Sequence, residues 1–320
     1  MQRCSNSITI VSVIEFKPAY VRLLRSGELE DRVQQARAHL SNCDVCPWKC
    51  GIDRLAGIMG VCRTGEKARL GSYGPHHGEE DPLRGRGGSG TIFFSRCNLR
   101  CQFCQNHAIS QADAGELVSA QTLAAVMLEL QDCGCHNINF VSPSHVVPQI
   151  LEAVLIAARR GLNLPLVYNT GGYDALEMIR LLDGVIDIYM PDMKYASQQA
   201  ARFYSKIPRY PQVNQECVKE MHRQVGDLQL DENGIAQRGL LIRHLILPNG
   251  LAGTREITNF IAREISPQTY LNLMDQYRPE FNARQQPKIN RLISREEVRE
   301  AYQMAAQAGL QRLDSANSHQ

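Results

Sequence analysis

The sequence of 320 residues lacks three features that would indicate work at a membrane or on nucleic acid. Its 35 basic residues are matched by 33 acidic ones, so the net charge is only +2 and no basic excess favours a nucleic-acid backbone. The longest apolar runs, at 8–14 and 245–247, are far shorter than the roughly 20 residues that span a bilayer. The first residues have no signal-peptide pattern. We therefore expect a cytoplasmic protein with no membrane partner, for which nucleic acid is a disfavoured partner.

Cysteine, by contrast, is present eleven times and is unevenly placed. Seven cysteines fall in two groups, which are Cys43, Cys46, Cys50 and Cys62, followed by Cys97, Cys101 and Cys104. In a reducing compartment, thiols separated by two or three residues favour metal ligation over disulfides. The spacing therefore predicts two separate metal-binding loops.

The composition of the chain changes at about residue 90. Residues 1–90 are predicted to form an N-terminal extension, with a helix over 17–41 and a loop region rich in cysteine and glycine that needs metal to hold its shape. Residues 91–320 are predicted to form the core, ending in a C-terminal helix.

Apolar strands and amphipathic helices alternate through this core. Strands are expected at 91–95, 138–142, 165–169, 186–191, 240–247 and 269–274, and helices at 120–132, 147–160, 174–182, 196–205, 214–225, 254–265 and 294–308. Ser119, Asp174 and Thr254 are predicted helix N-caps, and Asn233 with Gly234 predicts a hairpin within 228–238. Six strand–helix units in a row predict parallel strands, in either a doubly wound sheet or an incomplete barrel.

The second cysteine group lies just past the first core strand. Cys97, Cys101 and Cys104 have the spacing C-x3-C-x2-C. Iron–sulfur clusters are usually held by four thiolates, so three cysteines leave one iron without a protein ligand. The alternative is a zinc site with its fourth ligand elsewhere, such as His107 or His136.

At this point the sequence resembles a known family. The stretch SRCNLRCQFCQN at 95–106, followed by six strand–helix units, is similar to the radical S-adenosylmethionine (SAM) superfamily. Further strings resemble its pyruvate formate-lyase activating enzyme-like branch, namely CDVCPWKCGIDR (43–54), INFVSPSHVVPQIL (138–151), VYNTGGYD (167–174), YMPDMKY (189–195) and RGLLIRHLILPN (238–249).

The resemblance implies an α/β fold, specifically an incomplete (β/α)6 barrel, with a 4Fe–4S cluster on Cys97, Cys101 and Cys104. It implies an oxidoreductase in which SAM binds the open iron, is cleaved reductively, and abstracts hydrogen from an unidentified substrate. The substrate could be a partner protein, such as a glycyl radical enzyme to be activated. An electron donor such as flavodoxin or ferredoxin is expected. Two alternatives stay open, which are a zinc-binding interaction module without turnover and a radical SAM enzyme that modifies RNA.

The resemblance also carries over some SAM contacts, residue by residue, but no catalytic acid or base. The matching residues are Phe103, Asn169, Asp192 and Lys194, together with Ser142 and Ser144, which stand where relatives have a Gly-Gly-Glu-Pro-like motif. Three of these residues have a plainer interpretation from the residues alone. Asp192 could cap a turn, Lys194 could be a surface charge, and Asn169 could be a turn residue.

The first cysteine group has the spacing C-x2-C-x3-C-x11-C. Cys43, Cys46, Cys50 and Cys62 supply four thiolates, enough to close the coordination of one metal centre. The sequence predicts a second centre here, either iron–sulfur or zinc, with iron–sulfur favoured because the chain already requires cluster assembly.

Overall fold

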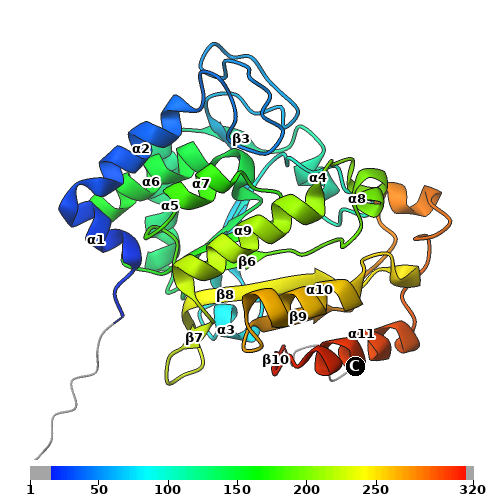
Figure 1. Ribbon diagram of the computed structural model, residues 1–320. Helices are drawn as coiled ribbons and strands as arrows, with labels where there is room; N and C mark the ends of the chain where they lie inside the picture. Colours follow the sequence, from blue (N-terminus) through cyan, green and yellow to red (C-terminus); the bar gives the residue numbers. More distant parts are fainter. Residues whose placement is uncertain (1–15, 315–320) are drawn as a thin grey trace, which may run out of the picture.

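The structure, a computed structural model, describes residues 16–314. Its centre is a curved sheet with helices packed on the outside (Figure 1). Six parallel strands lie side by side in the order β2 (Ser89–Phe94), β4 (Ile138–Val141), β5 (Leu166–Thr170), β6 (Ile188–Pro191), β8 (Ala236–Leu245) and β9 (Tyr270–Met274). All six predicted strands are therefore confirmed.

Helices connect these strands as crossovers. They are α5 (Ala120–Asp132), α6 (Val147–Arg159), α7 (Leu176–Leu181), α8 (Gln198–Ser205), α9 (Tyr210–Val225) and α10 (Thr254–Phe260), with α11 (Arg295–Ala308) after the last strand. The short helices are α3 (Asp81–Arg84), α4 (His107–Ser110), η1 (Pro143–His145), η2 (Pro248–Gly250), η3 (Ile261–Ile265) and η4 (Phe281–Gln285). Parallel strands with helical crossovers confirm the predicted (β/α)6 architecture.

The sheet is extended at both edges by shorter pairings. β10 (Arg312–Leu313) pairs with β9, while β1 (Ala68–His76) pairs antiparallel with β2 and with β3 (Glu116–Val118). Within the described residues, the end strands β10 and β3 do not pair with each other, so the barrel is incomplete. β1 belongs to the predicted extension yet joins the core sheet, and the division at residue 90 stays a prediction.

Local predictions at the helix ends had mixed outcomes. Ser119 caps α5 by accepting from the Thr122 amide at 3.1 Å, and β7 (Gln229–Leu230) forms the expected hairpin with β8. The helix predicted over 17–41 is instead two helices, α1 (Ala19–Ser26) and α2 (Glu28–Ala38), because Gly27 between them has a φ of 83°.

Two predicted N-caps were wrong. Ala175 precedes α7 without a side-chain cap, because Asp174 is buried and accepts hydrogen bonds from Tyr168 (2.9 Å) and Thr170 (2.8 Å). Gly253 precedes α10, and the Thr254 hydroxyl instead bonds a ring nitrogen of buried His244 at 2.9 Å. In both cases the side chain forms hydrogen bonds with buried partners in the core and therefore does not cap the helix.

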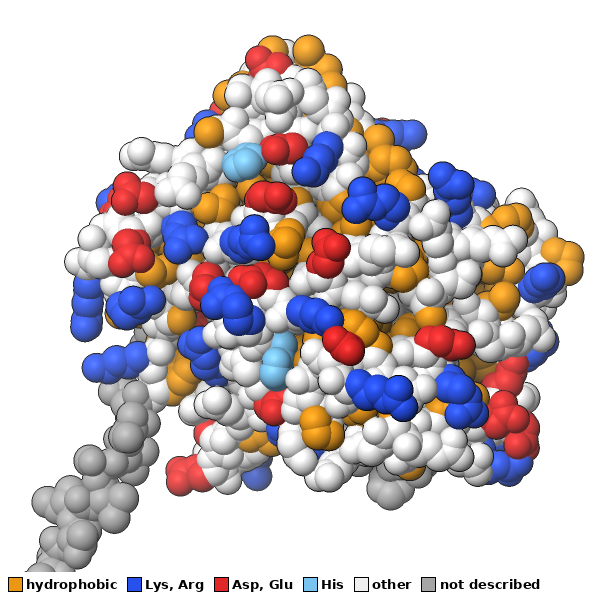
Figure 2. Space-filling model, in the orientation of Figure 1, with side chains coloured by type: hydrophobic (Ala, Val, Ile, Leu, Met, Phe, Trp, Pro, Cys, Tyr) orange, Lys and Arg blue, Asp and Glu red, His pale blue; other side chains and the backbone are white. Residues whose placement is uncertain are grey.

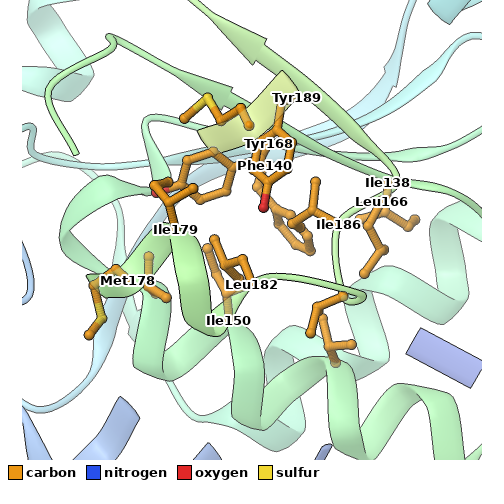
Figure 3. Close-up of a cluster of buried hydrophobic side chains, with 14 of the residues drawn as sticks. Ile138, Phe140, Ile150, Leu166, Tyr168, Met178, Ile179, Leu182, Ile186 and Tyr189 are labelled. Carbon is orange, nitrogen blue, oxygen red and sulfur yellow. The ribbon is translucent and has the colours of Figure 1, made fainter. Parts of the chain in front are cut away.

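The core that fixes β4, β5 and β6 lies between these strands and helices α6 and α7 (Figure 3). Its labelled members are almost completely buried: Ile138, Phe140, Leu166, Tyr168, Ile186 and Tyr189 face Ile150, Met178, Ile179 and Leu182. The buried Tyr189 hydroxyl donates to Gln224 at 2.6 Å, which removes the cost of an unpaired polar group. This packing holds the strands whose carboxyl ends carry the candidate site.

Among residues 16–314, none of the helices combines the length and the apolar character that a membrane crossing needs.

Candidate active site

The loop at 97–104 follows β2 and is fixed by its backbone. The amides of Arg100 and Gln102 donate to the carbonyls of Ser205 (3.0 Å) and Tyr204 (2.8 Å) at the end of α8. The Gln102 carbonyl in turn accepts from the Ala283 amide at 2.8 Å. Neighbouring elements therefore define the shape of this loop through backbone hydrogen bonds.

Each of the three cysteine sulfurs in this loop has at least one polar neighbour. The Ser205 hydroxyl donates to Cys101 Sγ at 3.0 Å, the Leu99 amide donates to Cys97 Sγ at 3.4 Å, and Cys104 Sγ lies 3.1 Å from the Ser110 hydroxyl. Burial raises the pKa of Cys97 to about 12 and that of Cys101 to about 11, although the nearby Lys194 ammonium lowers both. Thiols in this setting ionise when a bound metal supplies the positive charge.

The same three sulfurs line a cavity of about 430 Å³. This volume lies in the range of small-molecule sites, and the position past the carboxyl ends of the strands is where barrel folds place their ligands. Cys97, Cys101 and Cys104 are the only cysteines among the described residues that line it. Three thiols and no fourth fit an iron–sulfur cluster that keeps one iron open.

The structure brings most of the predicted SAM contacts to this cavity. Its wall includes Phe103, Ser142, Asn169, Asp192 and Lys194. Ser144 does not line it, because its side chain is buried and its hydroxyl lies 2.9 Å from that of Thr170. The SAM-binding roles of all six residues stay predictions.

Lys194 and Asp192 form an ion pair inside the site. Lys194 Nζ lies 2.5 Å from Asp192 Oδ2, and the two side chains are only 17% and 18% exposed. Burial acts to lower the pKa of Lys194, but the charge of Asp192 more than offsets this and raises it above its ordinary value. Lys194 is therefore a permanent, enclosed cation and not a solvated surface charge.

The backbone around this pair is held by α9. The Tyr210 hydroxyl accepts from the Lys194 amide at 3.0 Å, and Asn214 Nδ2 donates to the Asp192 carbonyl at 2.9 Å. Gly172 is required beside them, because its φ is 75° and a Cβ there would lie 2.2 Å from the Asp192 carbonyl oxygen. The Asn-Thr-Gly-Gly sequence at the end of β5 thus lets two strand ends approach closely.

Sequence reasoning missed a second charged group on the cavity wall. Arg243, on β8, donates to both carboxylate oxygens of Glu80 (2.7 and 2.6 Å) and to Glu79, and Asn272 also donates to Glu80 at 2.7 Å. The charge of Arg243 outweighs burial and holds the pKa of Glu79 at about 2. The sequence feature that could have indicated this charged group is a single arginine within the apolar strand sequence LLIRHLIL.

The four cysteines of the first group meet around a separate, much smaller cavity. Cys43, Cys46, Cys50 and Cys62 all line a space of about 10 Å³. Across residues 16–314, no three Cys, His, Asp or Glu side chains lie closely enough together to hold a single metal ion. The metal predicted for these four thiols stays a prediction.

These features define an α/β barrel with a three-thiol loop opening onto a polar cavity. The sequence profile of the Radical SAM superfamily matches residues 91–244, which contain the loop, Asn169, Asp192, Lys194 and Arg243. An uncharacterised protein of Methanocaldococcus jannaschii is 30% identical over 290 residues, covering 88% of this chain and 79% of that one. The chain belongs to the radical SAM superfamily, whose members cleave SAM reductively at an iron–sulfur cluster.

Solved structures resemble this chain more distantly. A radical SAM methyltransferase from Sphaerobacter thermophilus is 17% identical, with a TM-score of 0.48 over 70% of this chain and 65% of that one, which is less than two thirds of its length. A domain of pyruvate-formate lyase-activating enzyme from Bacteroides vulgatus is 13% identical, with a TM-score of 0.36 over 50% of this chain and 87% of that one.

Proposed function

We propose that this protein abstracts a hydrogen atom from a substrate held in the 430 Å³ cavity beside the 97–104 loop. The observation that carries the proposal is that three thiols and the ion pair of Lys194 and Asp192 line one cavity. When bound, the cluster and SAM supply a 5′-deoxyadenosyl radical, once a donor such as flavodoxin or ferredoxin has delivered one electron.

The residues of this chain bind and orient the reactants. The enclosed Lys194 ammonium offers a positive charge to the carboxylate of SAM, and Asp192 fixes the direction of that ammonium. Asn169 presents an amide at the end of β5, and Phe103 contributes an aromatic surface braced edge-on by Tyr195 and Tyr277. Buried side chains around the loop limit the access of water to a reactive radical.

The wall formed by Glu79, Glu80 and Arg243 gives the substrate side of the cavity a polar character. We infer that the group from which hydrogen is taken carries polar atoms, because polar atoms can bond the edges of these paired charges that face the cavity, whereas an apolar group would only desolvate them. A peptide backbone meets this requirement. Together with the motif resemblance to activating enzymes, this favours activation of a partner protein by formation of a glycyl radical.

The face shown in Figure 2 gives no support to a nucleic-acid substrate. On the face in Figure 2, Lys and Arg side chains are interspersed with Asp and Glu, as expected from a net charge of +2. Proteins that bind nucleic-acid backbone usually gather basic residues on one face.

The first test is SAM cleavage without any substrate. The protein would be reconstituted with iron and sulfide under anaerobic conditions, mixed with SAM and dithionite, and assayed for 5′-deoxyadenosine. We expect product from the wild type and from Cys133→Ala, whose cysteine is exposed and outside both loops. No product from a fully loaded wild-type protein would contradict the proposal.

The finer assignment needs a separate readout. A glycyl radical enzyme encoded near the gene would be incubated with the loaded protein, SAM and reductant, and examined by electron paramagnetic resonance. A glycyl radical doublet supports activation. SAM cleavage without the doublet would overturn activation of that partner while leaving the radical SAM assignment intact.

A further inference from the structure

We propose that Cys43, Cys46, Cys50 and Cys62 bind a second iron–sulfur cluster, and that the segment folded around it clamps the 97–104 loop in place. All four sulfur-bearing side chains line one cavity, and three of them are only 6% exposed. Four thiolates saturate a cluster, so this centre has no open iron and differs in kind from the first. It does not depend on the proposed function.

The segment that carries these cysteines is held partly by the main core, into which Leu40 and Val45 pack. Residues 39–67 contain no helix or strand in the structure. Several of its large apolar side chains face solvent, including Ile58 (51% exposed) and Met59 (60% exposed). A segment without regular structure and with outward apolar side chains gains further folding energy from metal ligation.

The local backbone is nevertheless arranged around the sulfurs. The Cys43 amide donates to the Ile52 carbonyl at 2.8 Å, and the Gly51 amide donates back to the Cys43 carbonyl at 2.9 Å. Gly60 lies against the third cysteine, where a Cβ would be only 2.8 Å from Cys50 Sγ. A sulfur bonded to metal cannot move aside, so this position needs glycine for space and not for an unusual φ.

The arrangement favours a cluster over a zinc ion. Zinc gathers four thiolates within about 2.3 Å of a single point, whereas each thiolate of a cubane binds a different iron. No three potential ligands in residues 16–314 are grouped for a single ion, although the four cysteines surround one space. The three cysteines of the 97–104 loop lie in the region that matches a cluster-binding superfamily, and they too are not close enough together to hold one ion.

Three hydrogen bonds connect this segment to the radical SAM site. Trp48 Nε1 donates to the Asn98 carbonyl at 2.7 Å, and Arg100 donates to the Val61 carbonyl at 2.5 Å. Arg54, only 1% exposed, donates to the His145 carbonyl after β4 at 2.9 Å. The segment thus reaches the 97–104 loop from both sides and the next strand end as well.

The test uses a triple variant in which Cys97, Cys101 and Cys104 are changed to Ala. The variant would be purified and reconstituted without oxygen, then assayed for iron, zinc and acid-labile sulfide. We expect about four irons and four sulfides per chain, against about eight of each in the wild type. One zinc without iron would overturn the iron–sulfur assignment, and no metal in a chain with native circular dichroism would overturn the site.

A matched glycine pair keeps the proposal testable if the triple variant does not fold. Gly60→Ala places a methyl group against Cys50 Sγ, while Gly65→Ala meets no atom within 4 Å and needs no unusual φ. We expect Gly60→Ala to lose about half of the bound iron and Gly65→Ala to keep all of it. Equal iron in the two variants would contradict the placement of a metal at Cys50.

Discussion

The two cysteine loops of this protein differ in the space that they surround and in how each uses its buried cation. The 97–104 loop places three thiols on a cavity of about 430 Å³, and Lys194 is part of the cavity wall. The 43–62 loop places four thiols around about 10 Å³, and Arg54 is turned toward backbone carbonyls. The first arrangement leaves room and a positive charge for a small molecule. In the second, the thiols surround almost no free space, and the arginine binds backbone carbonyls that hold the loop in place.

We infer from this difference that two quantities together distinguish a reactive metal centre from a structural one. They are the number of thiols and the volume of the cavity beside them. Spacing alone indicates metal in both loops. The structure shows that polar residues of β5 and β8, and those just after β6, line the same cavity as the three thiols. The predictions below test the contrast between the loops.

The largest effect is expected for Cys101→Ala. Its loss removes one of three thiolates from a centre that cannot function with two, so 5′-deoxyadenosine formation should fall by roughly 10³-fold or more. The assay is anaerobic product formation per chain, with Cys133→Ala as the control. Turnover at the wild-type rate would show that Cys101 is not a ligand of the cluster.

Arg54→Met should destabilise the whole molecule. The change leaves the buried carbonyl of His145 and the half-buried carbonyl of Gly65 without their donor, which costs about 3 kcal/mol in the free energy of unfolding. Urea unfolding of the loaded protein would measure it, and Arg63→Met, at an exposed arginine, is the matched control. Equal stabilities of the two variants would show that Arg54 does not join the 43–62 loop to the barrel.

Lys194→Ala should weaken SAM binding without loss of iron. The enclosed ammonium is replaced by a methyl group, and the lost charge-assisted contact lowers affinity roughly 10-fold to 100-fold. Equilibrium binding of SAM to the anaerobic loaded protein would measure it. Lys219→Ala removes an exposed lysine and should bind normally. Unchanged affinity in Lys194→Ala would refute its role in binding SAM.

The smallest effect is expected for Trp48→Phe, which keeps an aromatic ring but removes the hydrogen bond to the Asn98 carbonyl. We expect a cost of about 1 kcal/mol, seen as faster loss of the SAM-binding cluster to a chelator, with total iron unchanged at the start. Identical rates of loss in the variant and the wild type would show that the two loops are not coupled through Trp48.

The sequence predicted what is encoded locally and missed contacts between residues that the folded barrel brings together. The spacing of Cys97, Cys101 and Cys104 and the six apolar strands are local signals, and the 97–104 loop appears where they place it. The caps assigned to Asp174 and Thr254 failed because buried partners on other elements bind these side chains. The contact of Glu80 with Arg243 joins residues 163 positions apart, and no local pattern contains it.

Electron paramagnetic resonance of the reduced wild-type protein, recorded with and without SAM, tests the contrast between the loops most directly. We predict two cluster signals, of which SAM shifts only one, because only the 97–104 loop leaves an iron open. The shifted signal should be absent from the variant with Cys97, Cys101 and Cys104 changed to Ala. The remaining signal should not change when SAM is added. A signal that survives in that variant and shifts with SAM would contradict the account.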